Sequence, residues 1–345
     1  MKAFVISKIA NIKEAIQPLD WVDLPTPHPT GPEILIHVNT CGVCHTELDE
    51  IEGRTPPSHF PVVPGHQVVG TVVELGETAH RFKIGDRVGV AWIYSSCGHC
   101  EFCLRGEENL CPEFKATGRD ANGGYAEYML VNEDYAYRIP ENLNDLQAAP
   151  LLCAGAIGYR SLMLTGLKNG LRLGLTGFGA SGHLVLKMAQ EMYPDTEVYV
   201  FSRSEGDQQF ARQLGAVWAG NTEERSPKLL HAIIDTTPAW KPILAGMVNL
   251  MPGGRMVINA IRKETSDRML LAELDYPSQL WMEKEIKSVA NVTRQDVQEC
   301  LDLAARIGLK PEVQTYPFEQ ANQALWELKN RQIRGAKVLE ISSSK

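Results

Sequence analysis

The chain has 345 residues, 44% of them hydrophobic, which is enough to bury a core in each of two domains. Its formal net charge of −8 and pI of about 5.7 argue against a nucleic-acid partner, because such partners require a basic surface. No apolar run is long enough to span a membrane, so no membrane partner is expected. Met1–Ile6 reads as a β-strand rather than an apolar leader, and we therefore expect a cytoplasmic protein.

Short apolar runs separated by turn residues occupy residues 1–150. The clearest of them are Glu33–Val38, Gln67–Val73 and Asp86–Val90. Many short strands with Gly and Pro between them predict a β-rich, barrel-like domain.

Four cysteines lie close together inside this first part, in a lobe at residues 95–113 with the spacing C-x2-C-x2-C-x7-C. Such a cluster can fold one loop around a tetrahedral metal, and it predicts a closed, structural zinc site. A ferredoxin-type cluster is disfavoured by the long last gap, and disulfides are disfavoured in a reducing compartment. The proposed ligands of this structural zinc are Cys97, Cys100, Cys103 and Cys111.

Three further metal-binding side chains, Cys44, His66 and Cys153, are scattered along the chain, each beside a glycine or another small residue. Together they would make a three-ligand site with one coordination position left open, which is typical of zinc that takes part in a reaction. The remaining Cys41 and Cys300 have no matching partners, and we expect them to be buried as small hydrophobic residues.

From residue 151 to residue 291, strand-like runs alternate with helical stretches. This alternation predicts a doubly wound parallel sheet, the architecture of dinucleotide-binding domains, and hence an α/β protein. The predicted strands are Leu171–Leu175, Val198–Phe201, Ala232–Ile234 and Arg255–Ile258.

A glycine-rich turn of the form G-x-G-x-x-G follows the first of these strands and precedes apolar residues at helical spacing from Leu184 to Met192. The glycines would let the backbone approach a pyrophosphate at the N-terminus of the helix. The alternative is an ordinary strand-to-helix turn. The proposed cofactor-binding residues are Gly177, Gly179, Ala180, Ser181 and Gly182.

The choice between NAD and NADP depends on the residues after the next strand, where NAD-binding proteins carry an acid that bonds the ribose. This chain has Ser202, Arg203 and Ser204 there, and the nearest carboxylates, Glu205 and Asp207, fall in the loop. A guanidinium between two hydroxyls suits a phosphate, so the sequence predicts that NADP is preferred over NAD. The alternative is that Arg203 only points to solvent.

The last part of the chain contains a predicted amphipathic helix at Arg294–Ile307 and a final strand at Lys337–Ile341. We expect these segments to return to the first domain. The predicted organisation is therefore a catalytic domain of residues 1–150 and 292–345, with a dinucleotide-binding domain of residues 151–291 inserted into it.

Five motifs follow one another along the chain: Gly42–Thr46, Pro64–His66, Gly85–Val88, the four-cysteine lobe and Leu152–Gly155. In this order they resemble the zinc-dependent alcohol dehydrogenases of the medium-chain dehydrogenase/reductase superfamily, over nearly the full length. The resemblance implies a β-rich, GroES-like catalytic domain, a Rossmann domain, an active site in the cleft between them, and a homodimer or homotetramer.

The resemblance assigns Cys44, His66 and Cys153 to the catalytic zinc, which makes two zinc ions per chain. It implies that Thr46 accepts the proton of the alcohol and that His45 lies close to the cofactor phosphates. The alternatives are that Thr46 is a turn or N-cap residue and that His45 is an exposed loop residue.

Three positions depart from the pattern of the family. Gln67 replaces a glutamate that can approach the zinc, so a neutral amide stands where a carboxylate is usual. Glu47 replaces an aspartate, and it can still bond the far nitrogen of His66 and fix its orientation. The histidine that often ends the proton relay falls near Glu52, so either Glu52 substitutes for it or the proton leaves through water.

Trp92 occupies the position that, by resemblance, lines the substrate pocket beside the zinc, and Trp21, Ile93 and Tyr94 are weaker candidates. A bulky indole there favours small or medium primary alcohols and their aldehydes. The expected activity is hydride transfer between such an alcohol and NADP(H) or NAD(H). The alternatives are a nucleotide-binding redox sensor without turnover and a quinone reductase of the same superfamily.

Overall fold

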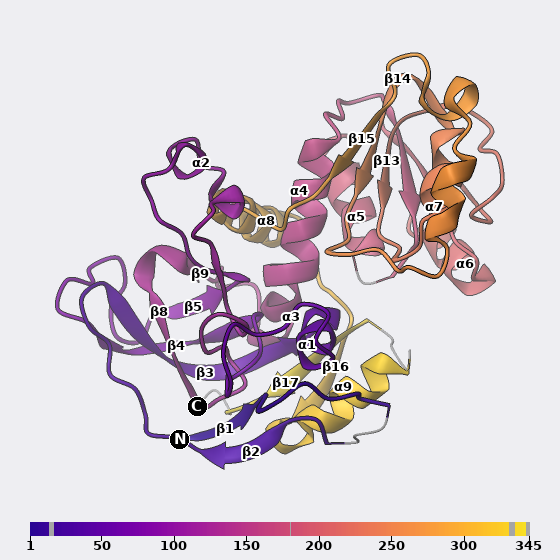
Figure 1. Cartoon of the computed structure of the whole chain (residues 1–345). Coiled ribbons are helices and arrows are strands. Elements are labelled where there is room, and N and C mark those ends of the chain that lie inside the picture. Colours follow the sequence, from indigo (N-terminus) through magenta and orange to yellow (C-terminus); the bar gives the residue numbers. More distant parts are fainter. Residues whose placement is uncertain (14–16, 180, 331–334, 343–345) are drawn as a thin grey trace. The chain divides into compact units, whose positions relative to one another are not determined.

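The computed structural model describes residues 1–13, 17–179, 181–330 and 335–342 (Figure 1). It contains two compact units. Unit 1 comprises Met1–Cys153 and Val292–Lys345, and unit 2 comprises Ala154–Asn291. Cys153, which the expected domain ranges assigned to the dinucleotide-binding domain, therefore lies at the end of the first segment of unit 1.

The main sheet of unit 1 has seven strands among the described residues, in the order β16-β17-β3-β4-β5-β9, with β8 paired to β3. The central strand β3 pairs antiparallel with β4, β8 and β17. The sheet consists of β3 (Glu33–Val43), β4 (Val68–Leu75), β5 (Arg87–Val90), β8 (Tyr128–Asn132), β9 (Ala136–Arg138), β16 (Val313–Pro317) and β17 (Ala336–Glu340).

Smaller elements complete unit 1. Two antiparallel pairs are formed by β1 with β2 and by β6 with β7. These strands are β1 (Lys2–Val5), β2 (Asp20–Asp23), β6 (Ile93–Ser95) and β7 (Lys115–Ala116). The helices are α1 (His45–Ile51), α2 (Glu101–Leu104), α3 (Asp145–Pro150), α8 (Arg294–Ile307) and α9 (Ala321–Lys329), with short 3-10 turns η1 (Glu108–Leu110), η2 (Glu133–Tyr135) and η6 (Phe318–Gln320).

The helix predicted at Arg294–Ile307 is confirmed as α8, and its ends have clear local causes. Thr293 and Asp296 form a capping box at its start. Gly308, with φ of 62°, ends it in the left-handed conformation that glycine adopts without strain.

The two ends of the chain share one hydrophobic core in unit 1. Ile6 from the N-terminal segment, Tyr125 from the middle and Leu325 from α9 are all fully buried in the same cluster. Burial of this apolar surface holds the first and last segments of the chain together.

Unit 2 is built on a sheet of six parallel strands among the described residues, in the order β12-β11-β10-β13-β14-β15. From β10 the chain winds first to one side of the sheet and then to the other, so the predicted doubly wound parallel sheet is confirmed. The strands are β10 (Arg172–Thr176), β11 (Glu197–Phe201), β12 (Trp218–Gly220), β13 (Leu230–Asp235), β14 (Leu250–Ile258) and β15 (Glu285–Ser288).

Helices connect these strands. Helices α4 and α5 pack against each other, and α7 packs on β13 and β14 through Ile243 and Met247. The elements are η3 (Leu151–Gly155, a π-helical turn at the border of the two units), α4 (Ala156–Leu164), α5 (Gly182–Met192), α6 (Glu205–Gln213), α7 (Lys241–Met247), η4 (Arg268–Glu273) and η5 (Tyr276–Leu280). In the part of the chain that the structure describes, no helix is both long and apolar enough to cross a membrane.

Candidate functional site

The four cysteines of the lobe are brought together in unit 1. The sulfur atoms of Cys97, Cys100, Cys103 and Cys111 all lie within 4.8 Å of one another. They come from the loop after β6, from α2 and from the residue that follows η1. The Cys97 and Cys103 sulfurs are 3.9 Å apart, much farther than a disulfide bond.

Backbone groups around this cluster favour thiolates. The N–H of Cys100 donates to the Cys97 sulfur at 3.3 Å, and the N–H of Glu113 donates to the Cys111 sulfur at 3.3 Å. A hydrogen bond from the backbone of His99 lowers the pKa of Cys97 to about 6, whereas burial raises the pKa of Cys111 to about 11. Four sulfur donors at mutual contact form a closed set, and this chemistry fits a tetrahedral zinc ion.

Cys44, His66 and Cys153 also converge, although they are far apart in the sequence. Their ligand atoms lie within 4.8 Å of one another, and the two sulfurs are 3.9 Å apart. Cys44 is the N-cap of α1, directly after β3. His66 precedes β4, and Cys153 lies in the π-helical turn η3. We call this group the three-residue cluster.

The two thiols of the three-residue cluster cannot easily ionise together. A hydrogen bond with Cys153 lowers the pKa of Cys44 well below its usual value, and the same bond raises the pKa of Cys153 well above it. A divalent cation held by both sulfurs would allow both of them to be thiolates. The donor set of two sulfurs and one imidazole fits zinc with one position open.

Glu47 contacts two members of the three-residue cluster, Cys44 and His66. Its Oε2 accepts the backbone N–H of Cys44 at 2.8 Å, and its Oε1 lies 2.7 Å from His66 Nδ1. Both side chains are almost completely buried. The first contact also closes the capping box that starts α1, so one carboxylate begins the helix and orients the imidazole.

Thr46, His45 and Gln67 flank the ligands of the three-residue cluster in the sequence. Thr46 Oγ1 lies 3.6 Å from the Cys44 sulfur, and His45 is exposed at the start of α1. Gln67 is buried, and its amide lies where a Cβ on Gly42 would be, so only glycine leaves room for it.

Glu52 lies at the C-cap of α1, with its carboxylate held by two cations. Lys329 Nζ donates to it at 2.6 Å, and Arg54 is its second partner. Burial opposes ionisation, but the hydrogen bonds from Lys329 and Arg54 outweigh it and lower the pKa of Glu52. The structure therefore places the Glu52 carboxylate in ion pairs with Lys329 and Arg54.

Trp92 lies between an aromatic ring and a cation. Its ring centroid is 5.0 Å from that of Phe114, and the guanidinium carbon of Arg119 is 5.3 Å from the indole. Its Nε1 is buried without a hydrogen-bond partner among the described residues. Sequence reasoning missed Arg119, because no motif marks it.

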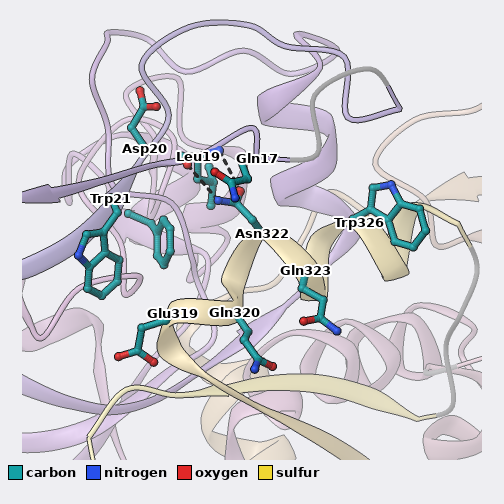
Figure 2. Close-up of a pocket in the computed structure, with 10 residues that line it drawn as sticks. Gln17, Leu19, Asp20, Trp21, Glu319, Gln320, Asn322, Gln323 and Trp326 are labelled. Atoms are coloured by element: carbon teal, nitrogen blue, oxygen red, sulfur yellow. Dashed lines mark hydrogen bonds between the residues drawn. The ribbon is translucent and has the colours of Figure 1, made fainter.

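A cavity of about 670 Å³ in unit 1 has a different lining (Figure 2). Trp21 and Trp326 line it, together with polar side chains of the loop before β2, of β2, of η6 and of α9. Trp21 packs edge-on against Phe4 and Phe318. None of the residues predicted for the zinc sites or for the relay lines this cavity, so its size alone does not make it the reaction site.

The glycine-rich turn joins β10 to α5 in unit 2. Gly177 has φ of 81°, and a Cβ there would lie 2.8 Å from Thr236 Oγ1. A Cβ on Gly182 would lie 2.9 Å from the carbonyl oxygen of Gly177, while nothing lies within 4 Å of a Cβ on Gly179. Ser181 is the N-cap of α5, and Ala180 lies outside the described residues.

The carboxylate of Asp207, which the sequence analysis placed in a loop, lies close to the end of β11. Asp207 lies in the first turn of α6, and its Oδ2 accepts the hydroxyl of Ser202 at 2.9 Å. Ser204 caps the same helix by accepting the N–H of Asp207 at 3.2 Å. Arg203 is exposed and has no ion pair with a described residue. The sequence-based expectation that no carboxylate lies at the end of β11 is therefore wrong. Helix α6 brings Asp207 back to Ser202, directly after this strand.

Comparison with known proteins places this geometry in a family. Residues 30–141 match the family described as alcohol dehydrogenase GroES-like domain. The chain is 40% identical over 329 residues to the "Probable alcohol dehydrogenase AdhA" of Mycobacterium tuberculosis, covering 94% of this chain and 93% of that one. It is 33% identical to an alcohol dehydrogenase of Geobacillus stearothermophilus, over 97% and 99% of the two chains.

A solved structure agrees with these relatives. A cinnamyl alcohol dehydrogenase of Sorghum bicolor superimposes with a TM-score of 0.82 at 28% identity, covering 100% of this chain and 98% of that one. The fold is therefore a GroES-like domain with a Rossmann domain, and the chain belongs to the zinc-type alcohol dehydrogenases of the medium-chain dehydrogenase/reductase superfamily.

Proposed function

We propose that the chain is a zinc-dependent alcohol dehydrogenase that interconverts small or medium primary alcohols and their aldehydes, with NADP(H) favoured over NAD(H). The observation that carries this proposal is the convergence of Cys44, His66 and Cys153, with ligand atoms within 4.8 Å of one another. Two thiolates and a neutral imidazole balance a divalent ion and leave one position for a substrate oxygen.

Each proposed zinc site has a defined task. Cys44, His66 and Cys153 would hold the catalytic ion, and the four cysteines of the lobe would hold the structural ion. Zinc bound at the three-residue cluster supplies Lewis acidity, which lowers the pKa of an alcohol and polarises an aldehyde.

The residues around the three-residue cluster supply orientation and proton transfer. Glu47, 2.7 Å from His66 Nδ1, would fix the orientation of the imidazole and leave its other nitrogen free to bind the metal. Thr46 Oγ1 lies 3.6 Å from the Cys44 sulfur, and we assign it the proton of the alcohol. Trp92, fixed between Phe114 and Arg119, is the proposed apolar wall for the substrate chain.

The nucleotide is the hydride acceptor in this proposal and would bind at the glycine-rich turn of unit 2. The open space at Gly179 and the N-terminus of the eleven-residue helix α5 suit a pyrophosphate. Arg203 follows β11, is exposed and has no ion pair with a described residue, so its guanidinium is available for a 2′-phosphate. Asp207 already holds the hydroxyl of Ser202, which leaves Arg203 as the main determinant of the preference for NADP.

We also propose that the chain forms a homodimer or homotetramer through unit 2. Large apolar side chains are exposed along and before β15, among them Met269, Trp281 and Ile286. Exposed apolar surface of this kind is typical of contacts between subunits. Measurement of the native mass in solution tests the proposal, and a monomer would contradict it.

Activity measurements on two cysteine variants test the proposed reaction. The native enzyme should reduce NADP in the presence of a primary alcohol. Cys153→Ser should lose at least about 10³-fold in kcat, because a three-ligand zinc site needs all of its ligands. Cys300→Ala, which removes a buried cysteine outside both clusters, should keep the activity. Nucleotide binding without alcohol-dependent reduction in the native protein would refute the proposal and favour a redox sensor.

A further inference from the structure

A buried carboxylate on α1 takes no part in the proposed binding of zinc, substrate or nucleotide. Glu50 is 1% exposed, and neither of its carboxylate oxygens has a hydrogen-bond partner among the described residues. An unpartnered buried carboxylate costs stability, and such groups are kept mainly where they have a function or hold a water molecule.

The other carboxylates of this helix are already engaged. Glu47 contacts Cys44 and His66, and Asp49 accepts Arg54 Nε at 2.5 Å. Glu52 is held by Lys329 and Arg54. Among the described carboxylates on and next to α1, only Glu50 has two oxygens without a hydrogen-bond partner.

Glu50 lies one helical turn after Thr46, the residue proposed to accept the proton of the alcohol. Thr46 and Glu50 are four residues apart on α1, so their Cβ atoms lie about 5–6 Å apart on one face of the helix. Thr46 Oγ1 is in turn 3.6 Å from the Cys44 sulfur. A hydroxyl and a carboxylate at this spacing can contact each other directly or through one water molecule.

Charged groups on several elements act on Glu50. Burial raises its pKa well above the usual value, and the charges of Glu47 and Cys44 act in the same direction. The charges of His66 and of Arg119, from the loop after β7, act in the opposite direction. A carboxylate with a raised pKa is a better proton acceptor near neutral pH than an ordinary glutamate.

We propose that Glu50 takes up the proton released in alcohol oxidation, with the Thr46 hydroxyl passing it from the alcohol to the Glu50 carboxylate. This inference rests on the proposed function. The O–H bond of the alcohol breaks, its proton goes to Thr46 Oγ1, and the proton of Thr46 goes to Glu50. The hydride leaves the carbon with its electron pair and reduces the nicotinamide nucleotide. In aldehyde reduction the same protons move in reverse.

The Arg119 side offers the accepted proton a way to solvent. Arg119 pairs with Asp120 at 2.6 Å, and these two side chains are 24% and 15% exposed. The loop that carries them lies against the cluster, because a Cβ on Gly118 would be 2.8 Å from the backbone N of Gly65. Water at this partly exposed pair can take the proton from Glu50 between turnovers.

Two variants of Glu50 test the proposal with butan-1-ol and NADP. Glu50→Gln should lower kcat for oxidation about 10²-fold, the usual contribution of one proton-transfer group, with little change in KM. Glu50→Gln should also remove the rising limb of the pH profile, in which kcat/KM increases with pH as Glu50 loses its proton. Glu50→Asp keeps a carboxyl group and should retain this limb at a reduced rate. Glu133→Gln, at another buried carboxylate of unit 1, is the control and should leave the limb in place.

A double variant tests whether Thr46 and Glu50 act in series. Thr46→Val should remove the same pH limb, and Thr46→Val combined with Glu50→Gln should be no slower than the slower single variant. Infrared spectra provide a readout independent of turnover: the native protein should show a protonated-carboxyl band that Glu50→Gln lacks. If Glu50→Gln does not fold, the proposal is tested by the pH profile of kcat/KM in Thr46→Val and by the infrared spectrum of Glu50→Asp.

The possible failures are distinguishable. A native enzyme without alcohol-dependent activity would refute the proposed function itself. An active native enzyme whose Glu50→Gln variant keeps the pH limb and a kcat within about twofold would refute only the role of Glu50. Loss of the limb in Glu52→Gln but not in Glu50→Gln would move the role to Glu52.

Discussion

Glu47 connects the start of a helix to the geometry of a proposed metal ligand. Its two oxygens reach Cys44 N at 2.8 Å and His66 Nδ1 at 2.7 Å, so the residue that caps α1 also sets the rotation of the imidazole. The extra methylene that distinguishes glutamate from the aspartate usual in the family does not prevent this contact.

Replacing Glu47 should weaken zinc binding at the three-residue cluster. We expect Glu47→Gln to lower zinc affinity there by about 10–100-fold, because a neutral amide no longer stabilises the donating imidazole. Zinc retained after dialysis against a chelator measures this, with the ion of the four-cysteine lobe as internal reference. Glu197→Gln, in unit 2, is the control. Equal zinc retention in Glu47→Gln and the native chain would contradict the assignment.

Arg203 should decide the choice of nucleotide. In Arg203→Ala we expect kcat/KM for NADP to fall about tenfold or more, because a charged hydrogen bond to phosphate is lost, while kcat/KM for NAD stays unchanged. Arg225→Ala in the same unit is the control. A native enzyme that prefers NAD by more than about tenfold would refute the preference for NADP.

At the residue scale, the residues that belong to spaced motifs were predictable from the sequence. Cys44, His66 and the four cysteines of the lobe were found because their types and spacing are specific to metal sites. Glu50 and Arg119 were not found, because their importance comes from burial and from packing of the loop at Gly118 against Gly65. For Glu50 one local signal existed, its four-residue spacing from Thr46, and it gains meaning only when the helix is known to be buried.

At the scale of elements, most strands of unit 2 were predictable from apolar runs, as Leu171–Leu175 and Val198–Phe201 show. β15 was missed because all four of its residues are exposed, so it has no apolar pattern to read. Asp207 was assigned to a loop because a helix that starts right after a strand leaves few residues to mark the boundary. In both places the local sequence carries too little pattern to mark the element.

An ion pair joins α9 to β17 in the main sheet of unit 1. Lys337 Nζ on β17 is completely buried and donates to Glu327 Oε2 on α9 at 2.8 Å. Gln314 and Tyr316 on β16 also accept from it. The bond from Lys337 lowers the pKa of Glu327 to about 2.

Removing the carboxylate of this pair should destabilise unit 1. We expect Glu327→Gln to lower the free energy of unfolding by about 2 kcal/mol at neutral pH, since a hydrogen bond to a charged group is lost while Gln314 and Tyr316 still accept from Lys337. The folded pKa lies below that of an unfolded glutamate, about 4.3, so the contribution is complete above that pH and is lost as the pH falls through the folded value.

Denaturant unfolding at several pH values measures this pair. The difference between Glu327→Gln and the native chain should shrink as the pH is lowered from about 5 to about 3. Glu319→Gln, at an exposed carboxylate just before α9, should show no such difference. A difference that stays constant over this range would contradict the assigned ion pair.

At the scale of the whole molecule, the four-cysteine lobe is tied to the last part of the chain. Glu108 Oε1, in the lobe, accepts the backbone N–H of Arg294 at 2.8 Å and its Nε at 3.0 Å. The lobe therefore packs at the start of α8, within unit 1. The sequence predicted the lobe and the helix separately, but the contact between them depends on the tertiary fold.

Loss of one lobe ligand should affect local stability more than chemistry. Cys103→Ser should bind one zinc ion fewer per chain, and the lobe should be cut by protease on the order of tenfold faster, because an unliganded loop opens more often. Limited proteolysis followed by mass spectrometry locates the cut. Cys300→Ala is the control. Intact resistance to protease in Cys103→Ser would show that the lobe does not depend on a metal.

Metal analysis of the purified native chain and of two variants tests the central claim most directly. We predict two zinc ions per native chain, one in Cys153→Ser with alcohol oxidation abolished, and one in Cys103→Ser with alcohol oxidation retained. Full alcohol-dependent reduction of NADP by a Cys153→Ser protein that has lost its second zinc ion would contradict the claim that Cys44, His66 and Cys153 hold the metal of the reaction.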